Sequence, residues 1–441
     1  MNEDSQITRR EFVAGTATAS AAVATGFPNA LPAAPNEKLA IDGGTRAVTE
    51  AVPAWNRWGE PEAERLDDLI GQSSLFYWKG PQTTAFIERF RRHCPATHVQ
   101  TCSSGTAALH IAVAAAGIGP GDEVITSPIT DIGTVIGVLF QQAVPVFADV
   151  EPDTHNLDPA DVARKITPRT KAIIAVHLAG NPCDMSRLRE LADRHKLVLI
   201  EDAAQAWGAQ CQGKPLGTFG DIVCFSMMNS KHISTGDGGV VASSHEKFGP
   251  LLQRFGDKGT DRVDRSPLQW LASNYRMSEA QAAIGAAQLD RLAGIVSQRN
   301  RLGRLFTAGI SGLPGVIPHR EREADRSSCW FYMFRIDPKK FRCDRAQLVK
   351  AMKAERVGAI AGYIRRPLYA EKMFQEHSFF AGQWPVRDSG QTKTDYRKVN
   401  CPVAEFTLET GIRLRLTENM TEEYVRQLAL GVSKVIRHYA A

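Results

Sequence analysis

Short runs of apolar, mostly β-branched residues alternate with helical patterns along the chain from residue 37 onward. Four such runs predict strands: 123–126, 145–148, 172–176 and 197–200. Because these runs lack alternating polar positions, they predict strands that are buried on both faces of a parallel sheet. Between the last two runs, Asp184 precedes an amphipathic segment over 185–191 and predicts a capped helix. This order predicts an α/β domain with right-handed crossovers.

The pattern changes towards the C-terminus. Ser278 and Gln281 form a capping box that predicts the start of a long helix running towards Phe306. An aromatic strand over 330–336, a helix around Leu348 and Met352, and a final helix from Thr421 follow. These elements predict a smaller α+β domain. We therefore expect a large domain over 37–300 and a C-terminal small domain over 301–441.

The first 36 residues predict an export signal. Arg9 and Arg10 precede Phe12 and an uncharged stretch rich in alanine and threonine, with small residues over 30–34. This layout is typical of a twin-arginine signal and predicts a periplasmic or exported protein. The stretch is too polar for a stable membrane span. The alternative is a low-complexity N-terminus on a cytoplasmic protein.

Composition narrows the class of protein. Of the 441 residues, 43% are hydrophobic and 23% are charged, which excludes a disordered chain and a multi-span membrane protein. The net charge is +5 with acids and bases interspersed, so we expect no nucleic-acid partner. None of the eight cysteines has C-x-x-C spacing, which predicts reduced core thiols and no metal site.

Two segments of the α/β domain have features of ligand sites, one for an anion and one for a cation. Residues 103–109 form a small-residue turn into an apolar helix, whose N-terminus suits a phosphate or simply marks a capped helix. Asp202 follows a buried strand, at the sheet edge where open α/β sheets bind ligands. A buried carboxylate needs a cation, and a protonated ring nitrogen would serve. The alternative is a helix-capping or salt-bridged aspartate.

Lys231 lies in a turn between an apolar strand and the glycine-rich bend over 236–239. If its amine is desolvated, it can form a Schiff base; otherwise it is an ordinary surface lysine. Asn274 and Arg276 directly precede the capped helix and have no function that their position alone predicts.

Taken together and in order, these segments resemble the DegT/StrS family of sugar aminotransferases, a branch of the fold type I enzymes that use pyridoxal 5'-phosphate. The resemblance covers nearly all of the chain after residue 36. Its motifs are 43–45, 119–124, 176–178, 201–206, 230–231 with 236–239, and 274–277. It implies a large domain with a mostly parallel central sheet and a smaller C-terminal α+β domain.

The resemblance also implies roles for individual residues. Lys231 would hold the cofactor covalently and then move a proton as base and acid. Asp202 would pair with the pyridinium nitrogen and keep it protonated. Gln205 would approach the ring or its phenolic oxygen.

The phosphate of the cofactor would be held by residues of two turns: Gly105, Thr106 and Ser226. Asn274 would reach the phosphate of the neighbouring subunit. That role implies a homodimer.

Two positions depart from the family pattern. Family members usually carry an aromatic residue that stacks on the cofactor after a Pro-x-x-Thr stretch, and here Asp131 follows Thr130. Many members carry Leu-His-Pro where this chain has 416–418, Leu-Thr-Glu. Asp131 would contact a polar substrate or change the electrostatics of the cofactor. Arg365 and Arg366 are further substrate candidates, or else solvated surface arginines.

The resemblance implies an aminotransferase that moves an amino group from glutamate or glutamine to a keto-sugar or keto-cyclitol. Two alternatives stay open. The chain could be an exported non-catalytic or regulatory relative, or a dehydratase of the kind that has histidine in place of the lysine. His232 is adjacent, but the spacing from Ser226 to the glycines puts Lys231 in the lysine position.

Overall fold

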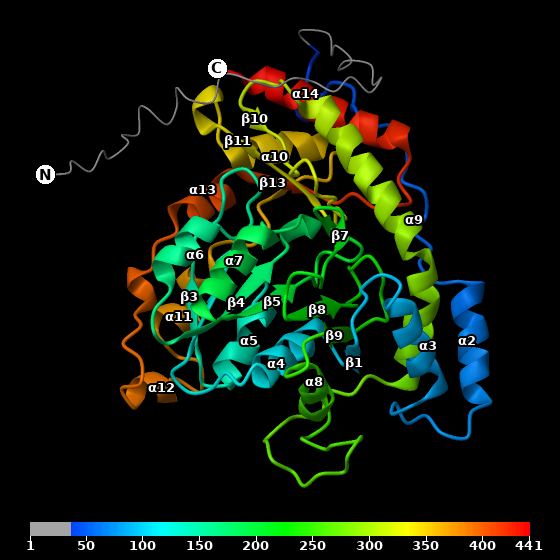
Figure 1. Cartoon of the computed structure of the whole chain (residues 1–441). Helices are drawn as coiled ribbons and strands as arrows, with labels where there is room; N and C mark the ends of the chain where they lie inside the picture. Colours follow the sequence, from blue (N-terminus) through cyan, green and yellow to red (C-terminus); the bar gives the residue numbers. More distant parts are fainter. Residues whose placement is uncertain (1–36) are drawn as a thin grey trace, which may run out of the picture.

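A computed structural model describes residues 37–441, and a seven-stranded sheet forms the centre of its larger part (Figure 1). Its order is β1-β9-β8-β5-β4-β2-β3. The strands from β8 to β3 pair in parallel, whereas β9 is antiparallel to β8 and β1. This confirms the mostly parallel sheet. The strands are β1 (His98–Cys102), β2 (Glu123–Thr126), β3 (Val144–Phe147), β4 (Thr170–Val176), β5 (Val198–Asp202), β8 (Ile222–Ser226) and β9 (Gly239–Ser243).

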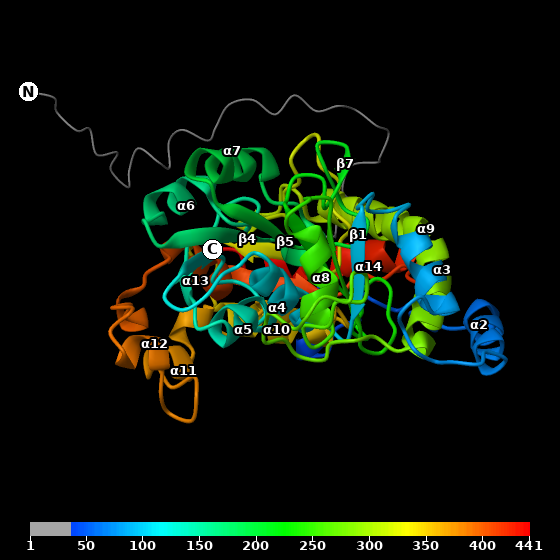
Figure 2. The same ribbon diagram turned by 60° about the horizontal axis from the view of Figure 1, so that its bottom comes forward.

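Helices cover both faces of this sheet (Figure 2). One face packs against α4 (Gly105–Ala115), α5 (Gly133–Phe140) and α8 (Gly249–Gly256). The other packs against α6 (Pro159–Lys165), α7 (Met185–His195), α3 (Pro81–Phe90) and the first half of α9 (Glu279–Ile310), with α2 (Glu60–Ile70) outside. Asp184 caps α7, and Ser278 with Gln281 forms the predicted capping box of α9. Both predictions are confirmed.

A second, smaller core forms around a four-stranded antiparallel sheet of order β10-β11-β13-β12. Helices α10 (Arg345–Ala354) and α14 (Glu422–Tyr439) and the second half of α9 pack on it. Its strands are β10 (Val316–Ile317), β11 (Tyr332–Ile336), β12 (Ile360–Ala361) and β13 (Gly411–Leu414). The smaller α+β domain therefore has its own hydrophobic core.

The N-terminal segment of the described chain contributes to this smaller core. Leu39 and Val48 are buried in it, and the Glu355 carboxylate accepts hydrogen bonds from Ala40 N at 2.7 Å and Ala47 N at 2.8 Å. Residue 300, where the sequence places the domain boundary, lies within α9, whose two halves pack on the two cores. The boundaries of the domains stay a prediction.

Short helices over 363–410 cover the edge strand β3, which protects its unpaired backbone groups. The Tyr396 hydroxyl donates to Pro145 O at 2.9 Å, and Phe374 packs on Phe147. These elements are η4 (Leu368–Ala370), α11 (Lys372–Gln375), α12 (Pro385–Asp388), η5 (Tyr396–Lys398) and α13 (Pro402–Thr410). The remaining short elements are η1 (Ala40–Asp42), η2 (Leu178–Gly180), η3 (Pro338–Lys340), β6 (Gln210–Cys211) and β7 (Lys214–Pro215).

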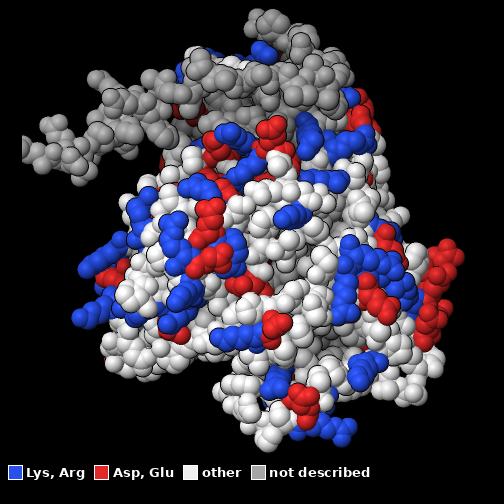
Figure 3. All heavy atoms as spheres, in the orientation of Figure 1, with Lys and Arg blue, Asp and Glu red and all other residues white. Residues whose placement is uncertain are grey.

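The eight cysteines are all free thiols, and all but Cys343 are buried, as predicted. Over residues 37–441, no helix combines the length and the apolar character needed to cross a membrane. In the same range no group of histidine, cysteine and acidic residues is arranged to hold a metal ion. Figure 3 shows basic and acidic side chains interspersed over the face in view. The predicted export signal lies outside the described residues.

Candidate active site

Five loops meet at one end of the large sheet, where the parallel strands have their carboxyl ends. Strands β1, β2, β4, β5 and β8 point the same way, so the loops that follow them emerge at their shared carboxyl edge. Ligands of open α/β sheets bind at this edge. The loops are 103–104, 127–132, 177–184, 203–209 and 227–238. The candidate residues that the sequence spreads over more than a hundred positions therefore share one end of the sheet.

Lys231 is buried in the loop after β8, with 7% of its surface exposed. Its Nζ lies 3.6 Å from the centroid of the Trp330 ring, whose Nε1 donates to Ser230 O at 2.7 Å. Burial lowers the pKa of Lys231 to about 8, although the charges of Asp202 and Asp131 act to raise it. The lowered pKa increases the fraction of neutral amine near physiological pH, and the neutral amine is the nucleophilic form of a lysine.

The backbone of the lysine loop is held from the N-terminal part of the chain. The Arg57 guanidinium is buried and donates to the carbonyls of Asn229, Lys231 and His232. The His232 ring is directed towards Ser328, because its Nε2 lies 2.9 Å from Ser328 O. A carbonyl oxygen can only accept a hydrogen bond, so Nε2 is the donor. Burial lowers the pKa of His232 well below its usual range, so the ring is neutral.

Asp202 ends β5 and is 4% exposed. Its carboxylate accepts from Thr134 Oγ1 at 2.8 Å and from Ala204 N at 3.1 Å. Burial raises the pKa of Asp202, while these hydrogen bonds and the Lys231 ammonium act in the opposite direction. A buried carboxylate with two neutral donors fits a site that receives a protonated ring nitrogen.

The three residues predicted to hold a phosphate lie around the start of α4. A Cβ atom on Gly105 would lie 2.6 Å from Ser226 Cβ, so only glycine allows the turn and β8 to approach this closely. Ser104 caps the helix through Ala107 N, and Thr106 Oγ1 lies close to Gly133. The first N–H groups of a helix lack intrahelical partners, and its dipole attracts an anion. The cradle therefore fits a phosphate.

Gln205 and Asp131 both act on Tyr363, Gln205 by a hydrogen bond and Asp131 by its charge. The buried Gln205 accepts from Ala179 N at 2.9 Å and donates to the Tyr363 hydroxyl at 3.1 Å. Burial and the charges of Asp131 and Asp202 raise the pKa of Tyr363. Asp131 is exposed and accepts from Gly133 N at 2.8 Å. Its carboxylate is thus close enough to act electrostatically on both Lys231 and Tyr363.

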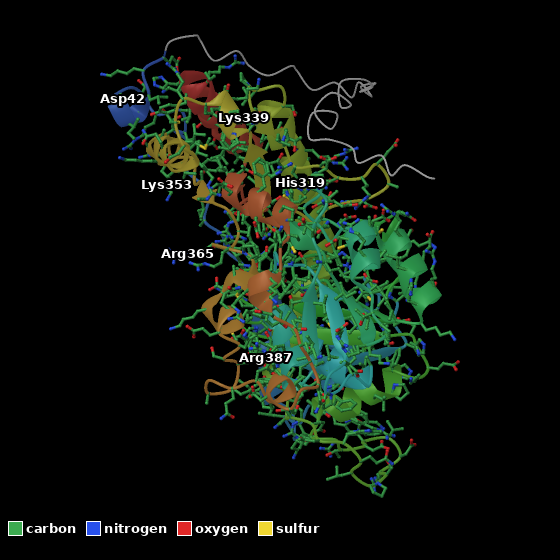
Figure 4. The ribbon with its side chains drawn as sticks, turned by 90° about the vertical axis from the view of Figure 1, so that its left-hand side faces the viewer. Asp42, His319, Lys339, Lys353, Arg365 and Arg387 are labelled. Atoms are coloured by element: carbon green, nitrogen blue, oxygen red, sulfur yellow. The ribbon has the colours of Figure 1, made fainter. Side chains whose placement is uncertain are left out.

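The structure does not bring the other predicted residues into contact with this group. Asn274 is exposed on the loop between α8 and α9, and its Oδ1 accepts from Arg276 Nε at 2.8 Å. Arg365 and Arg366 are exposed, and Arg366 Nε lies 3.8 Å from Glu371. In Figure 4, Arg365 lies at the surface between Lys353 of α10 and Arg387 of α12. Their roles stay predictions.

Sequence reasoning missed Thr134, Arg57 and Trp330 as site residues. A buried Asp202 carboxylate requires hydrogen-bond donors. The hydroxyl of Thr134, just after the loop that follows β2, could have been proposed as one of them for this reason. Trp330 was predicted only as part of a strand, and it instead lies two residues before β11. No local signal identifies Arg57, which contacts the lysine loop from 174 residues away in the chain.

Comparison with known proteins assigns the family. The model of the DegT/DnrJ/EryC1/StrS aminotransferase family matches residues 58–433. The chain belongs to this family. Members are aminotransferases, so this DegT-family protein is an enzyme that works with pyridoxal phosphate. The sequence-based expectation of the family and of the cofactor is confirmed, and a purely non-catalytic relative is not supported.

Individual relatives extend over most of the chain. The L-glutamine:2-deoxy-scyllo-inosose aminotransferase of Streptomyces kanamyceticus is 33% identical over 426 residues, which covers 92% of this chain and 98% of that protein. The GDP-perosamine synthase of Caulobacter vibrioides is 40% identical over 253 residues, covering 57% and 68%. The crystal structure of 3-amino-5-hydroxybenzoic acid synthase matches with a TM-score of 0.77 at 28% identity, covering 88% and 98%.

Proposed function

We propose that this DegT-family aminotransferase moves an amino group from glutamate or glutamine to a keto-sugar or keto-cyclitol. The observation that carries the proposal is the pair of Lys231 and Asp202, a buried amine whose pKa is lowered to about 8 near a buried carboxylate. The relatives support the acceptor class, because one is named for an inosose and another for a nucleotide-linked amino sugar.

Each residue of the site has a definite task in this proposal. When bound, pyridoxal phosphate supplies an electron sink for bond changes at the donor carbon. Lys231 would hold the cofactor through Nζ, and its amine would take and return the proton at that carbon. Asp202 Oδ atoms, oriented by Thr134, hold the proton on the ring nitrogen. Gln205 approaches the ring edge.

The anionic end of the cofactor has its own set of ligands in this proposal. Gly105, Thr106 and Ser226 would receive the phosphate at the start of α4. Trp330 covers the lysine amine and excludes water from it. Burial of the amine lowers its pKa to about 8 and so increases the fraction of the neutral form that the chemistry requires.

We propose a homodimer as the active unit. The loop between α8 and α9 projects from the molecule (Figure 1) and carries Asn274 with exposed apolar residues, including Leu268 at 70% and Leu271 at 97% exposure. The exposed Phe76 ring lies 5.6 Å from the Arg276 guanidinium of the same loop. An exposed apolar surface of this kind favours burial by a partner, here a second copy.

A dehydratase has less support. In that alternative a histidine replaces the functional lysine, and His232 is the adjacent candidate. The His232 ring is wholly buried and bonded to Ser328 O, whereas the Lys231 amine lies in the electrostatic reach of Asp202 and Asp131. These contacts favour the lysine over the histidine as the group that performs the chemistry.

We also propose export through the twin-arginine route. The proposal rests on Arg9, Arg10 and the uncharged stretch that follows them in the sequence. Since that route carries folded proteins, it suits an enzyme that takes up its cofactor before export.

Absorbance of the purified protein tests the proposed function. We expect a yellow protein whose cofactor band changes on addition of glutamate or glutamine and returns on addition of a keto-sugar or keto-cyclitol. Borohydride should fix the cofactor onto Lys231. Lys231→Ala should abolish the fixed adduct, and Lys353→Ala, an exposed lysine on α10, is the matched control. A reducible adduct that persists elsewhere in Lys231→Ala would contradict the assignment.

A further inference from the structure

Strand β13 and the extended residues that follow it place two arginines, Arg413 and Arg415, on the face opposite the small-domain core. Ile412 and Leu414 are buried in that core, and Leu416 follows the same alternation. Successive side chains of an extended strand point to opposite faces. Arg413 and Arg415 therefore lie together on the other face, about 6.6–6.8 Å apart along the chain.

Arg413 lies against two aromatic rings beside the candidate active site. Its guanidinium lies 5.3 Å from the centroid of the Phe331 ring and 5.9 Å from that of Tyr363. Tyr363 in turn receives the hydrogen bond from Gln205 Nε2, and its phenol is affected by the charges of Asp131 and Asp202. One aromatic ring thus separates Arg413 from the groups that surround the cofactor.

Arg415 lies on the side of the lysine loop. Its guanidinium lies 4.3 Å from the centroid of the Trp55 ring, and the Arg57 guanidinium lies 4.4 Å from the same centroid. Arg57 donates to the carbonyl of Lys231 at 2.5 Å. Arg413 is therefore linked to Gln205 through Tyr363, and Arg415 is linked to the lysine loop through Trp55 and Arg57.

This region carries more positive than negative charge. Arg299 pairs with Glu418 at 2.7 Å, and the same carboxylate accepts from Trp55 Nε1 at 2.8 Å. In the part of the chain that the structure describes, no carboxylate lies within 4.0 Å of the guanidinium groups of Arg413 or Arg415. One Nη of the wholly buried Arg299 also lacks a hydrogen-bond partner there.

Burying several positively charged groups together costs free energy unless an anion binds beside them. Burial lowers the pKa of both Arg413 and Arg415, and for Arg415 the charges of Arg299 and Arg413 act in the same direction. Partly desolvated guanidinium groups without partners favour an incoming oxyanion, which they can bind through two parallel hydrogen bonds. Contact with aromatic faces orients the groups and leaves their N–H edges free.

We propose that Arg413 and Arg415 form a subsite for an oxyanion of a reactant. The proposal rests on the proposed aminotransferase function. Two reactants offer this chemistry: the carboxylate of the amino-acid donor and the diphosphate of a nucleotide-linked sugar. In either case the small domain positions the reactant over Lys231, and Glu418 holds Arg299 and Trp55 behind the pair.

Equilibrium binding to the cofactor-loaded enzyme tests this subsite. Glutarate serves as an unreactive dicarboxylate and inorganic pyrophosphate as the diphosphate, each titrated by calorimetry. Arg413→Gln and Arg415→Gln should weaken binding of at least one probe by about 10-fold or more, since each removes a charge-assisted hydrogen bond. Arg413→Lys should lose less than Arg413→Gln, because it keeps the charge and loses the planar fork.

Arg437→Gln is the matched control, because Arg437 is an exposed arginine on α14 of the same domain. Loss of glutarate binding alone identifies the donor carboxylate as the ligand, and loss of pyrophosphate binding alone identifies the sugar diphosphate. The subsite is refuted if folded variants, checked by circular dichroism, bind both probes as tightly as the control. It is equally refuted if the wild type binds neither probe.

Kinetics separate this proposal from the proposed function. If the arginine variants raise KM for one reactant with kcat nearly unchanged, both proposals stand. If the enzyme transfers no amino group but binds an oxyanion through these arginines, the function fails and the subsite stands. Normal transfer with unchanged KM in both variants leaves the function intact and removes the subsite.

Discussion

In the role proposed for Lys231, its pKa controls how readily the apoprotein takes up its cofactor, and Asp131 acts on that pKa. Burial lowers it from 10.5 to about 8. At neutral pH this difference gives roughly 300 times more neutral amine than an ordinary lysine has. The Asp131 carboxylate raises the pKa by stabilising the ammonium. Asp131→Asn should therefore lower the pKa further and move cofactor uptake to lower pH.

The assay is the rate at which apoprotein binds pyridoxal phosphate, followed by absorbance between about pH 6 and about pH 10. In the wild type the rate should rise with pH and level off above about 8. Asp131→Asn should shift the midpoint downward. Asp153→Asn makes the same charge change at an exposed aspartate that pairs with Arg320, and its midpoint should match the wild type.

Stability gives a second measure of the same pKa. A lysine whose pKa is lower in the folded state binds fewer protons there than in the unfolded state between about pH 8 and 10.5. The free energy of unfolding of the apoprotein should therefore increase across this window, by about 3 kcal/mol relative to Lys231→Met. A wild-type uptake midpoint near 10.5, or an Asp131→Asn midpoint at or above that of the wild type, would refute this reasoning.

Four further outcomes are expected. Thr134→Val should destabilise the apoprotein by about 1–3 kcal/mol and weaken cofactor binding, because Asp202 loses a donor, whereas Thr134→Ser should retain both. Gly105→Ala should cost about 1–3 kcal/mol in unfolding free energy and raise the dissociation constant of the phosphate-bearing cofactor, since its Cβ would meet Ser226; normal binding would contradict the cradle. In stopped-flow absorbance, Asp131→Asn should slow the half-reaction with the keto-sugar and leave the glutamate half-reaction nearly intact, and equal slowing of both would place Asp131 on the cofactor. Replacing Arg9 and Arg10 together by lysine should leave the protein in the cytoplasm, and unchanged fractionation would show that the N-terminus is not a signal.

Local patterns in the sequence determined the framework of the large domain. The buried strands at 123–126 and 172–176 were predictable because full burial selects apolar and β-branched residues at most positions. The caps at Asp184 and Ser278 were predictable because capping depends on a side chain within three residues of its acceptor or donor. The order of the chemical motifs was likewise sufficient for the family, which the comparison confirms.

Tertiary structure decided the environment of the site, because burial and charge depend on groups that are distant in the chain. Lys231 has its lowered pKa through contacts that include Trp330, and its loop is held by Arg57. No spacing rule relates these residues. In the same way, only the fold, in which β13 pairs with β11, brings Arg413 to the Phe331 ring. The sequence by itself thus indicated which groups to propose for the chemistry, and the fold determined their burial and the charges and rings that surround them.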